Sequence, residues 1–177
     1  MSKMNLSKES FLAYLADLPE FANEIGTFTH MDNDEVYKQV ILHIDTHKYF
    51  IEEKLPITIT LKQSIASWFQ NSYSPLMMAI EETHAEKLFP HMTKIELFLN
   101  ISDHMYYLLE EKKRIELFNL GEGKSSDARD KLAAYVFIPF NQVVFSYISK
   151  YSTNRFRRFF AKLRLTKVHA KPKFQWK

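Results

Sequence analysis

Four motifs of the kind that begin helices recur along this chain, and they constrain its fold more than any other feature. In such a motif a capping side chain accepts a hydrogen bond from a free N–H group of the first helical turn. Asp32 with Glu35, Thr60 with Gln63, and Thr93 with Glu96 have the capping-box spacing, and Ser74 precedes Pro75. Only three of the 177 residues are Gly, against a usual share of about 7%. Because tight turns and phosphate loops need Gly, we expect an all-α fold.

The spacing of apolar residues predicts how far each of these helices extends. We expect a compact bundle of five to seven helices, with no sheet and no internal repeat. Trp68, Phe69 and Tyr73 are expected to pack in the core rather than to form a ligand cage. The predicted helices cover residues 8–18, 32–54, 60–69, 74–88 and 93–120, followed by a helical region over 127–164 that is interrupted at Pro139.

Charge divides the chain into two unequal parts. Residues 150–177 hold ten of the 24 Lys and Arg and neither Asp nor Glu, so this segment carries +10. The other 149 residues hold 14 basic and 21 acidic side chains and carry −7. We therefore expect a helical core domain over 1–149 and a basic C-terminal segment over 150–177. A cationic segment on an acidic body favours an anionic partner.

The basic segment has a pattern as well as a charge. Residues 151–167 are predicted to form an amphipathic helix, with Phe156, Phe159, Phe160 and Leu163 on one face. Residues 168–177 have no helical period and contain Pro172, which favours an extended arm. The candidate binding residues in the helix and arm are Arg155, Arg157, Arg158, Lys162, Arg164, Lys167, Lys171, Lys173, Phe174 and Trp176.

Three interpretations fit this segment. In the first, the phenylalanine face docks on the acidic body and the charges only serve solubility. In the second, the cations neutralise phosphates while Phe174 or Trp176 stacks on bases. In the third, the same helix enters an anionic membrane surface, or contacts a protein partner as an adaptor. Arginine in the helix and aromatic residues in the arm favour the second, so our working hypothesis is a non-enzymatic protein that binds nucleic acid.

Histidines offer an alternative based on metal chemistry. His43 and His47 lie four residues apart and share a helix face. Glu81 and His84 have the Glu-x-x-His spacing of carboxylate-bridged metal proteins, and His104 follows one helix later. A complete site of that class needs two such pairs and two further Glu, and only one pair is present. We therefore expect no metal and no cofactor, and we predict that His47 is a core histidine bonded to a backbone carbonyl.

Several other classes of protein and of active site receive little support from the sequence. The chain has no Cys, which excludes disulfides and thiolate chemistry. Glu9, Asp17 and Glu20 interrupt any apolar leader, so we expect a cytoplasmic protein. The uncharged residues 132–149 meet the minimum length of a membrane span, but Pro139, Asn141 and Gln142 lie at their centre, which favours a buried helix pair. No Gly-x-Ser-x-Gly motif appears, and the phosphate-loop pattern near Gly121 is incomplete.

Part of the chain resembles a bacterial helical module of unassigned function. The residues that carry this resemblance are Ser67-Trp68, Tyr73-x-Pro75-Leu76, Phe89-Pro90, Thr93, Glu96-Leu97-Phe98-Leu99 and His104-x-x-Tyr107-Leu108. They cover residues 68–108, which is less than a quarter of the chain. The resemblance implies a helical fold and a bacterial source, and it implies no activity.

Overall fold

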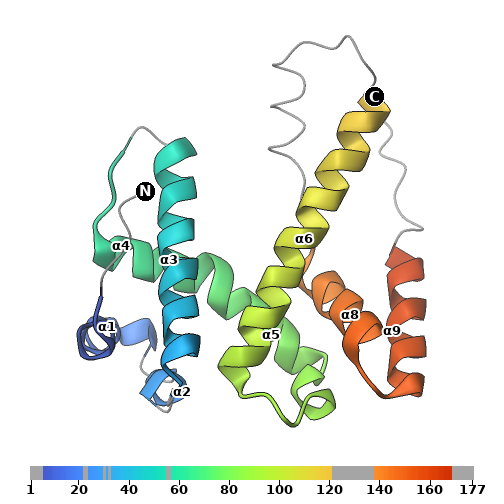
Figure 1. Cartoon of the computed structure of the whole chain (residues 1–177), viewed down its shortest axis with the longest axis horizontal. Coiled ribbons are helices and arrows are strands. Elements are labelled where there is room, and N and C mark those ends of the chain that lie inside the picture. Colours follow the sequence, from blue (N-terminus) through green and yellow to red (C-terminus); the bar gives the residue numbers. More distant parts are fainter. Residues whose placement is uncertain are drawn as a thin grey trace. The chain divides into compact units, whose positions relative to one another are not determined.

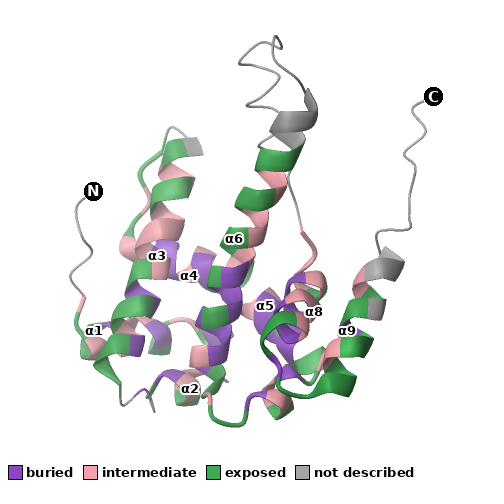
Figure 2. Cartoon of the chain, turned by 45° about the vertical axis from the view of Figure 1, so that its right-hand side comes forward, coloured by how far each residue is buried: buried purple, intermediate pink, exposed green. Residues whose placement is uncertain are grey.

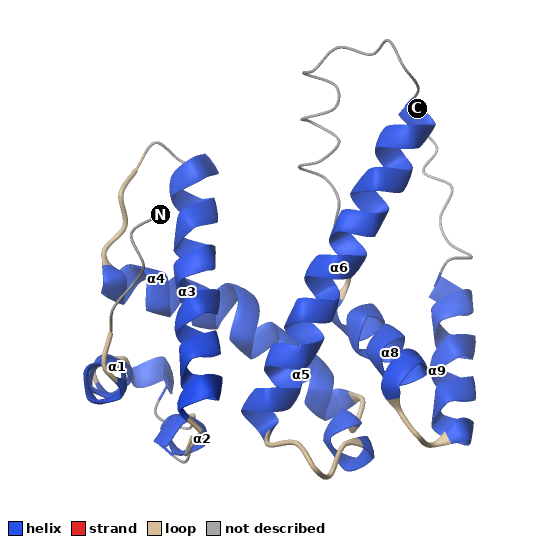
Figure 3. Ribbon diagram, in the orientation of Figure 1, coloured by secondary structure: helices blue, strands red, loops and turns tan. Residues whose placement is uncertain are grey.

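Helices are the regular elements throughout the described part of the chain (Figures 1 and 3). A computed structural model describes residues 6–21, 24–29, 31, 33–54, 57–120 and 138–168. The all-α prediction is confirmed. The elements are α1 (Lys8–Ala16), the 3-10 helix η1 (Pro19–Phe21), α2 (Ile25–Thr29), α3 (Asp34–Lys54), α4 (Leu61–Trp68), the π-helix η2 (Phe69–Tyr73), α5 (Ser74–Glu82), the 3-10 helix η3 (Ala85–Leu88), α6 (Lys94–Leu120), α8 (Phe140–Tyr151) and α9 (Arg155–Val168).

The chain forms two compact units. The first contains residues up to Met78 together with Met92–Leu99, and the second contains Ala79–His91 and the residues from Asn100 onward. Helices α5 and α6 each contribute residues to both units. In the first unit α1 packs with α2, and α3 packs with α4; in the second, α8 packs with α9 and with η3.

An aromatic cluster forms the core of the first unit. Phe28 from α2, Trp68 from α4, Tyr73 from η2 and Phe98 from α6 are all buried. The ring centroids of Tyr73 and Phe98 are 5.0 Å apart, and those of Trp68 and Phe98 are 5.8 Å apart in an edge-to-face arrangement. The hydroxyl of Tyr73 donates to the carboxylate of Glu24 at 3.0 Å, so its one polar atom is paired. The prediction that Trp68, Phe69 and Tyr73 are core residues is confirmed.

The chain passes Pro75 without a break, which corrects one predicted helix start. Ser74 has helical dihedral angles (φ −60°, ψ −47°), and its N–H donates to the carbonyl of Phe69, five residues earlier. Proline removes a backbone donor and crowds the carbonyl one turn before it. The wider π-helical turn of η2 accommodates both effects. Ser74 therefore lies inside a helical run and does not cap a new helix.

The other predicted helix starts are close to the observed ones. Thr60 and Gln63 form the complete capping box that their spacing predicts. Thr93 and Glu96 do the same, because each accepts a hydrogen bond from the backbone N–H of the other. Helix α3 is capped by Asn33, one residue after the predicted position, and its side chain accepts from the N–H of Glu35 at 2.9 Å.

Helix α5 ends earlier than its apolar pattern predicts. Its last residue is Glu82, and His84 follows with a left-handed conformation (φ 53°). Histidine tolerates this region better than most residues, so it can end a helix where no Gly is available. Leu88, which we expected on the same helix, lies in η3.

Removal of a central ring tests the aromatic core. Phe98 is fully buried, whereas Phe159 in α9 is 58% exposed. We expect Phe98→Ala to lower the free energy of unfolding by about 3–5 kcal/mol, because it removes ring contacts and leaves a cavity. The control Phe159→Ala should change it by less than about 0.5 kcal/mol. Urea unfolding followed by circular dichroism measures both, and equal effects would contradict the assignment of the core.

Candidate functional site

The basic segment is divided into two parts by a short non-helical turn. Helix α8 ends at Tyr151, Ser152 is extended (φ −67°, ψ 135°), and α9 begins at Arg155. Asn154 caps α9, since its side-chain oxygen accepts from the N–H of Arg157 at 3.1 Å. The prediction of one helix over residues 151–167 is therefore wrong at its start. Short polar side chains at 152–154 bond to nearby backbone groups, and this competes with helix formation.

Helix α9 packs on α8 through a small residue and two arginines. Ala161 is only 4% exposed and is the buried residue among the described side chains of α9. Arg158 is half-buried, and its Nε donates to the carbonyl of Ser149 at 3.1 Å. The guanidinium of Arg164 lies over the ring of Phe145, 5.0 Å from the ring centroid. These contacts place residues on both sides of the predicted domain boundary at 149 in one packed unit.

The three phenylalanines of α9 remain exposed although the helix packs on α8. Phe156, Phe159 and Phe160 are 79%, 58% and 57% exposed, and α9 shows a largely exposed surface in Figure 2. The interpretation in which this face docks on the acidic body is therefore wrong for these three side chains. The reason is that the helix uses Ala161, which permits close approach, and the long arginine side chains for packing.

Exposed cations border the phenylalanines. Arg155, Arg157, Lys162 and Arg164 are exposed, and Asp and Glu are absent from residues 138–168. Of the other candidates, Lys167 belongs to α9, but its side chain lies outside the described residues, as does that of Leu163. Lys171, Lys173, Phe174 and Trp176 also lie outside the described residues, and so does the predicted arm from residue 169.

A groove runs beside α9 in the second unit. Its volume is about 310 Å³, which is at the lower end of the range for small-ligand sites. Sequence reasoning missed this groove, because the groove depends on how α9 packs on α8 and no local sequence pattern reports that packing. The lining residues are Thr83, Leu88, Phe145, Ile148, Asn154, Phe156, Arg157, Phe160, Ala161 and Arg164.

Two candidate metal-binding histidines form pairs with serine hydroxyls. The Nε2 of His47 lies 3.0 Å from the Oγ of Ser67, so the predicted backbone partner of His47 is wrong. The Nε2 of His104 lies 3.0 Å from the Oγ of Ser146. Burial lowers the pKa of both imidazoles, and the charge of Lys150 lowers that of His104 further.

The remaining metal candidates lie in different places. His43 packs near the ring of Phe98 in the first unit, at 6.2 Å between ring centroids. Glu81 is exposed near the end of α5, and His84 is exposed in the turn after that helix. Among the described residues, no three His, Asp or Glu side chains come together as a metal site would require. The structure therefore does not assemble the set His43, His47, Glu81, His84 and His104.

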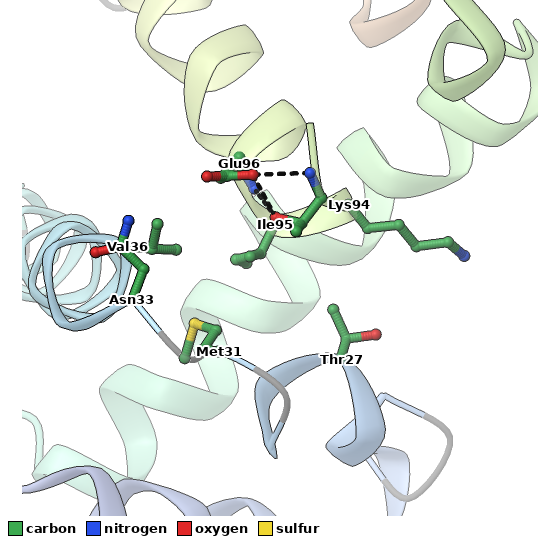
Figure 4. Close-up of a pocket in the computed structure, with 8 residues that line it drawn as sticks. Thr27, Met31, Asn33, Val36, Lys94, Ile95 and Glu96 are labelled. Carbon is green, nitrogen blue, oxygen red and sulfur yellow. Dashed lines mark hydrogen bonds between the residues drawn. The ribbon is translucent and has the colours of Figure 1, made fainter. Parts of the chain in front are cut away.

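A pocket in the first unit lies beside the starts of α3 and α6 (Figure 4). Its volume is about 250 Å³, and its lining includes Met31, Asn33, Lys94 and Glu96. Helix N-termini attract anions, but the capping side chains already occupy backbone donors here. Glu96 accepts from the N–H of Thr93 at 2.8 Å. We do not assign a ligand to this pocket.

No helix in the described ranges is long and apolar enough to cross a membrane. The part of the uncharged run 132–149 that is described forms most of α8, whose buried residues are Val143, Val144, Tyr147 and Ile148. The rest of that run, residues 132–137, lies outside the described residues.

Comparisons with protein-family models, with curated proteins and with solved structures find no match to this chain. The resemblance of residues 68–108 to a bacterial helical module therefore stays a prediction.

The histidine pairs predict a pH dependence of stability. Burial holds the pKa of His47 and His104 below the ordinary value of 6.5 in the folded chain. The unfolded chain then binds more protons near pH 6, so stability should fall as the pH decreases through about 6.5 and below. Urea unfolding at pH 7.5 and 5.5 measures this difference. Changing both residues to Gln should reduce the difference, and an unchanged dependence would assign it to other groups.

Proposed function

We propose that the protein binds anionic membrane surfaces through the exposed face of α9. The observation that carries this proposal is the outward placement of Phe156, Phe159 and Phe160 on a helix whose other face packs on α8. Three neighbouring exposed rings are unusual on a soluble surface unless the patch contacts a partner. The cations at its border make an anionic partner the complementary one.

The two kinds of side chain act together at a lipid surface. Phenylalanine rings enter the boundary between headgroups and acyl chains, and this removes apolar area from water. Each Lys or Arg near an anionic surface adds about 1 kcal/mol, and the cytoplasmic leaflet carries the anionic lipids. A cytoplasmic protein with this helix would therefore attach peripherally to the inner face of the membrane.

Nucleic acid is the second candidate, and the charge of +10 over residues 150–177 favours it. The geometry of the rings supports it less. Phe159 and Phe160 lie edge to face, with centroids 5.8 Å apart and planes at 72°. Successive bases stack on ring faces, so this arrangement does not provide parallel platforms. Insertion into lipid requires only an exposed apolar face.

Vesicle binding by a triple variant tests the membrane proposal. We expect Phe156→Ser, Phe159→Ser and Phe160→Ser together to weaken binding to phosphatidylglycerol vesicles by roughly tenfold or more, because the inserted apolar area is lost. The matched control changes Leu42, Tyr49 and Phe50, three exposed residues of α3, to Ser and should leave binding unchanged. Cosedimentation measures both. Equal binding to phosphatidylcholine vesicles, or full binding by the triple variant, would sink the proposal.

The salt dependence of RNA binding tests the second candidate. Arg155→Gln, Arg157→Gln and Lys162→Gln remove three exposed cations, while Arg158 is kept because it bonds to Ser149. If these cations contact phosphates of single-stranded RNA, the log–log salt slope should fall by roughly 0.7 for each lost contact. Titration of labelled RNA at several salt concentrations gives this slope. RNA binding that survives the triple phenylalanine change, with no binding to vesicles, would make nucleic acid the leading function.

A further inference from the structure

The groove beside α9 has an apolar interior and cationic ends. Ala161 forms its floor, and Phe156 and Phe160 belong both to the groove and to the exposed face of α9. Arg157 lies four residues before Ala161 and Arg164 lies three residues after it, so each arginine is about one helical turn from the floor. Apolar walls with an arginine at each end suit a chain-like molecule that carries an anionic group.

The charges around the groove favour a ligand with an anionic group. None of the residues that line the groove is Asp or Glu. Helices α8 and α9 contain neither, and the carboxylates of Glu81, Glu82 and Glu86 belong to the segment that supplies Thr83 and Leu88. Arginine binds phosphate with two parallel hydrogen bonds, which a carboxylate-free wall leaves available. A zwitterionic headgroup carries a cation next to its phosphate, and Arg157 and Arg164 repel that cation; a neutral headgroup has no phosphate for them to bind.

The geometry points to this groove as the binding site of one phospholipid molecule with a phosphate-bearing anionic headgroup. The phosphate binds at Arg157, because the guanidinium of Arg164 lies over the ring of Phe145, and part of one acyl chain lies over Ala161 between Phe160 and Phe145. The inference rests on the proposed membrane binding for the source of the lipid. Because Phe156 and Phe160 also belong to the inserted face, the groove opens beside the lipid surface that α9 contacts.

A soluble single-chain probe separates this site from membrane attachment. Dodecyl phosphate, used below its aggregation concentration, carries both the chain and the phosphate. We expect it to bind with a stoichiometry of one per protein in isothermal titration calorimetry. Inorganic phosphate and dodecyl maltoside, each of which lacks one half of the ligand, should bind at least tenfold more weakly. No saturable binding of dodecyl phosphate would overturn the inference.

Two double variants with the same loss of charge locate the phosphate. Arg157→Gln with Arg164→Gln removes both groove arginines and should weaken dodecyl phosphate binding by roughly tenfold or more. Arg155→Gln with Lys162→Gln removes two cations that do not line the groove and should change it by less than about twofold. Equal effects would mean general attraction and would overturn the site. Arg157→Gln alone keeps the Arg164 contact with Phe145 and should still weaken binding severalfold.

Phe159 distinguishes failure of this inference from failure of the proposed function, because it belongs to the exposed face but does not line the groove. Phe159→Ser should therefore weaken vesicle binding and leave dodecyl phosphate binding unchanged. Vesicle binding by the unaltered protein without dodecyl phosphate binding overturns the groove site alone. Dodecyl phosphate binding without vesicle binding supports the site and overturns the membrane proposal.

Discussion

The contact of α9 with α8 determines which chemistry the C-terminal part of the protein presents. An amphipathic helix normally turns its apolar face toward the core. Among the described side chains of α9 the buried one is that of Ala161, and the Nε of Arg158 donates to the carbonyl of Ser149 in α8. A small side chain permits close approach of the two helices, and arginine stems cover apolar surface while their charged ends remain paired or solvated. The phenylalanines therefore face solvent, and the function that we propose follows from that orientation.

Backbone hydrogen bonding at two places maintains this arrangement and the core of the first unit. The non-helical residues 152–154 allow the chain to reverse from α8 into α9, and Asn154 compensates by capping the new helix. The π-helix η2 carries the chain past Pro75 and places Tyr73 against Phe98. In both places a local departure from α-helical geometry positions aromatic side chains, buried in one case and exposed in the other.

Sequence reasoning predicted the helices well and their orientations less well. Capping pairs such as Thr60 with Gln63 act within one turn, so their hydrogen bonds can be inferred from spacing alone. The helical passage through Ser74 could not be inferred, because a Ser–Pro pair begins many helices and only packing decides otherwise. The orientation of α9 could not be inferred for the same reason, because packing decides it. Both faces of that helix can pack, and the sequence does not show that Ala161 and Arg158 form the better contact. The partner of His47 was missed because Ser67 is twenty residues away on another helix.

The distribution of charge makes the anionic partner that we propose compatible with a net charge of only +3. Residues 1–149 carry −7, which on a simple sum would offset most of the +10 of the C-terminal segment. Electrostatic attraction between exposed charges, however, falls off over a Debye length of about 8 Å at physiological salt. A phosphate at Arg157 therefore senses the neighbouring cations of α9 much more strongly than distant carboxylates.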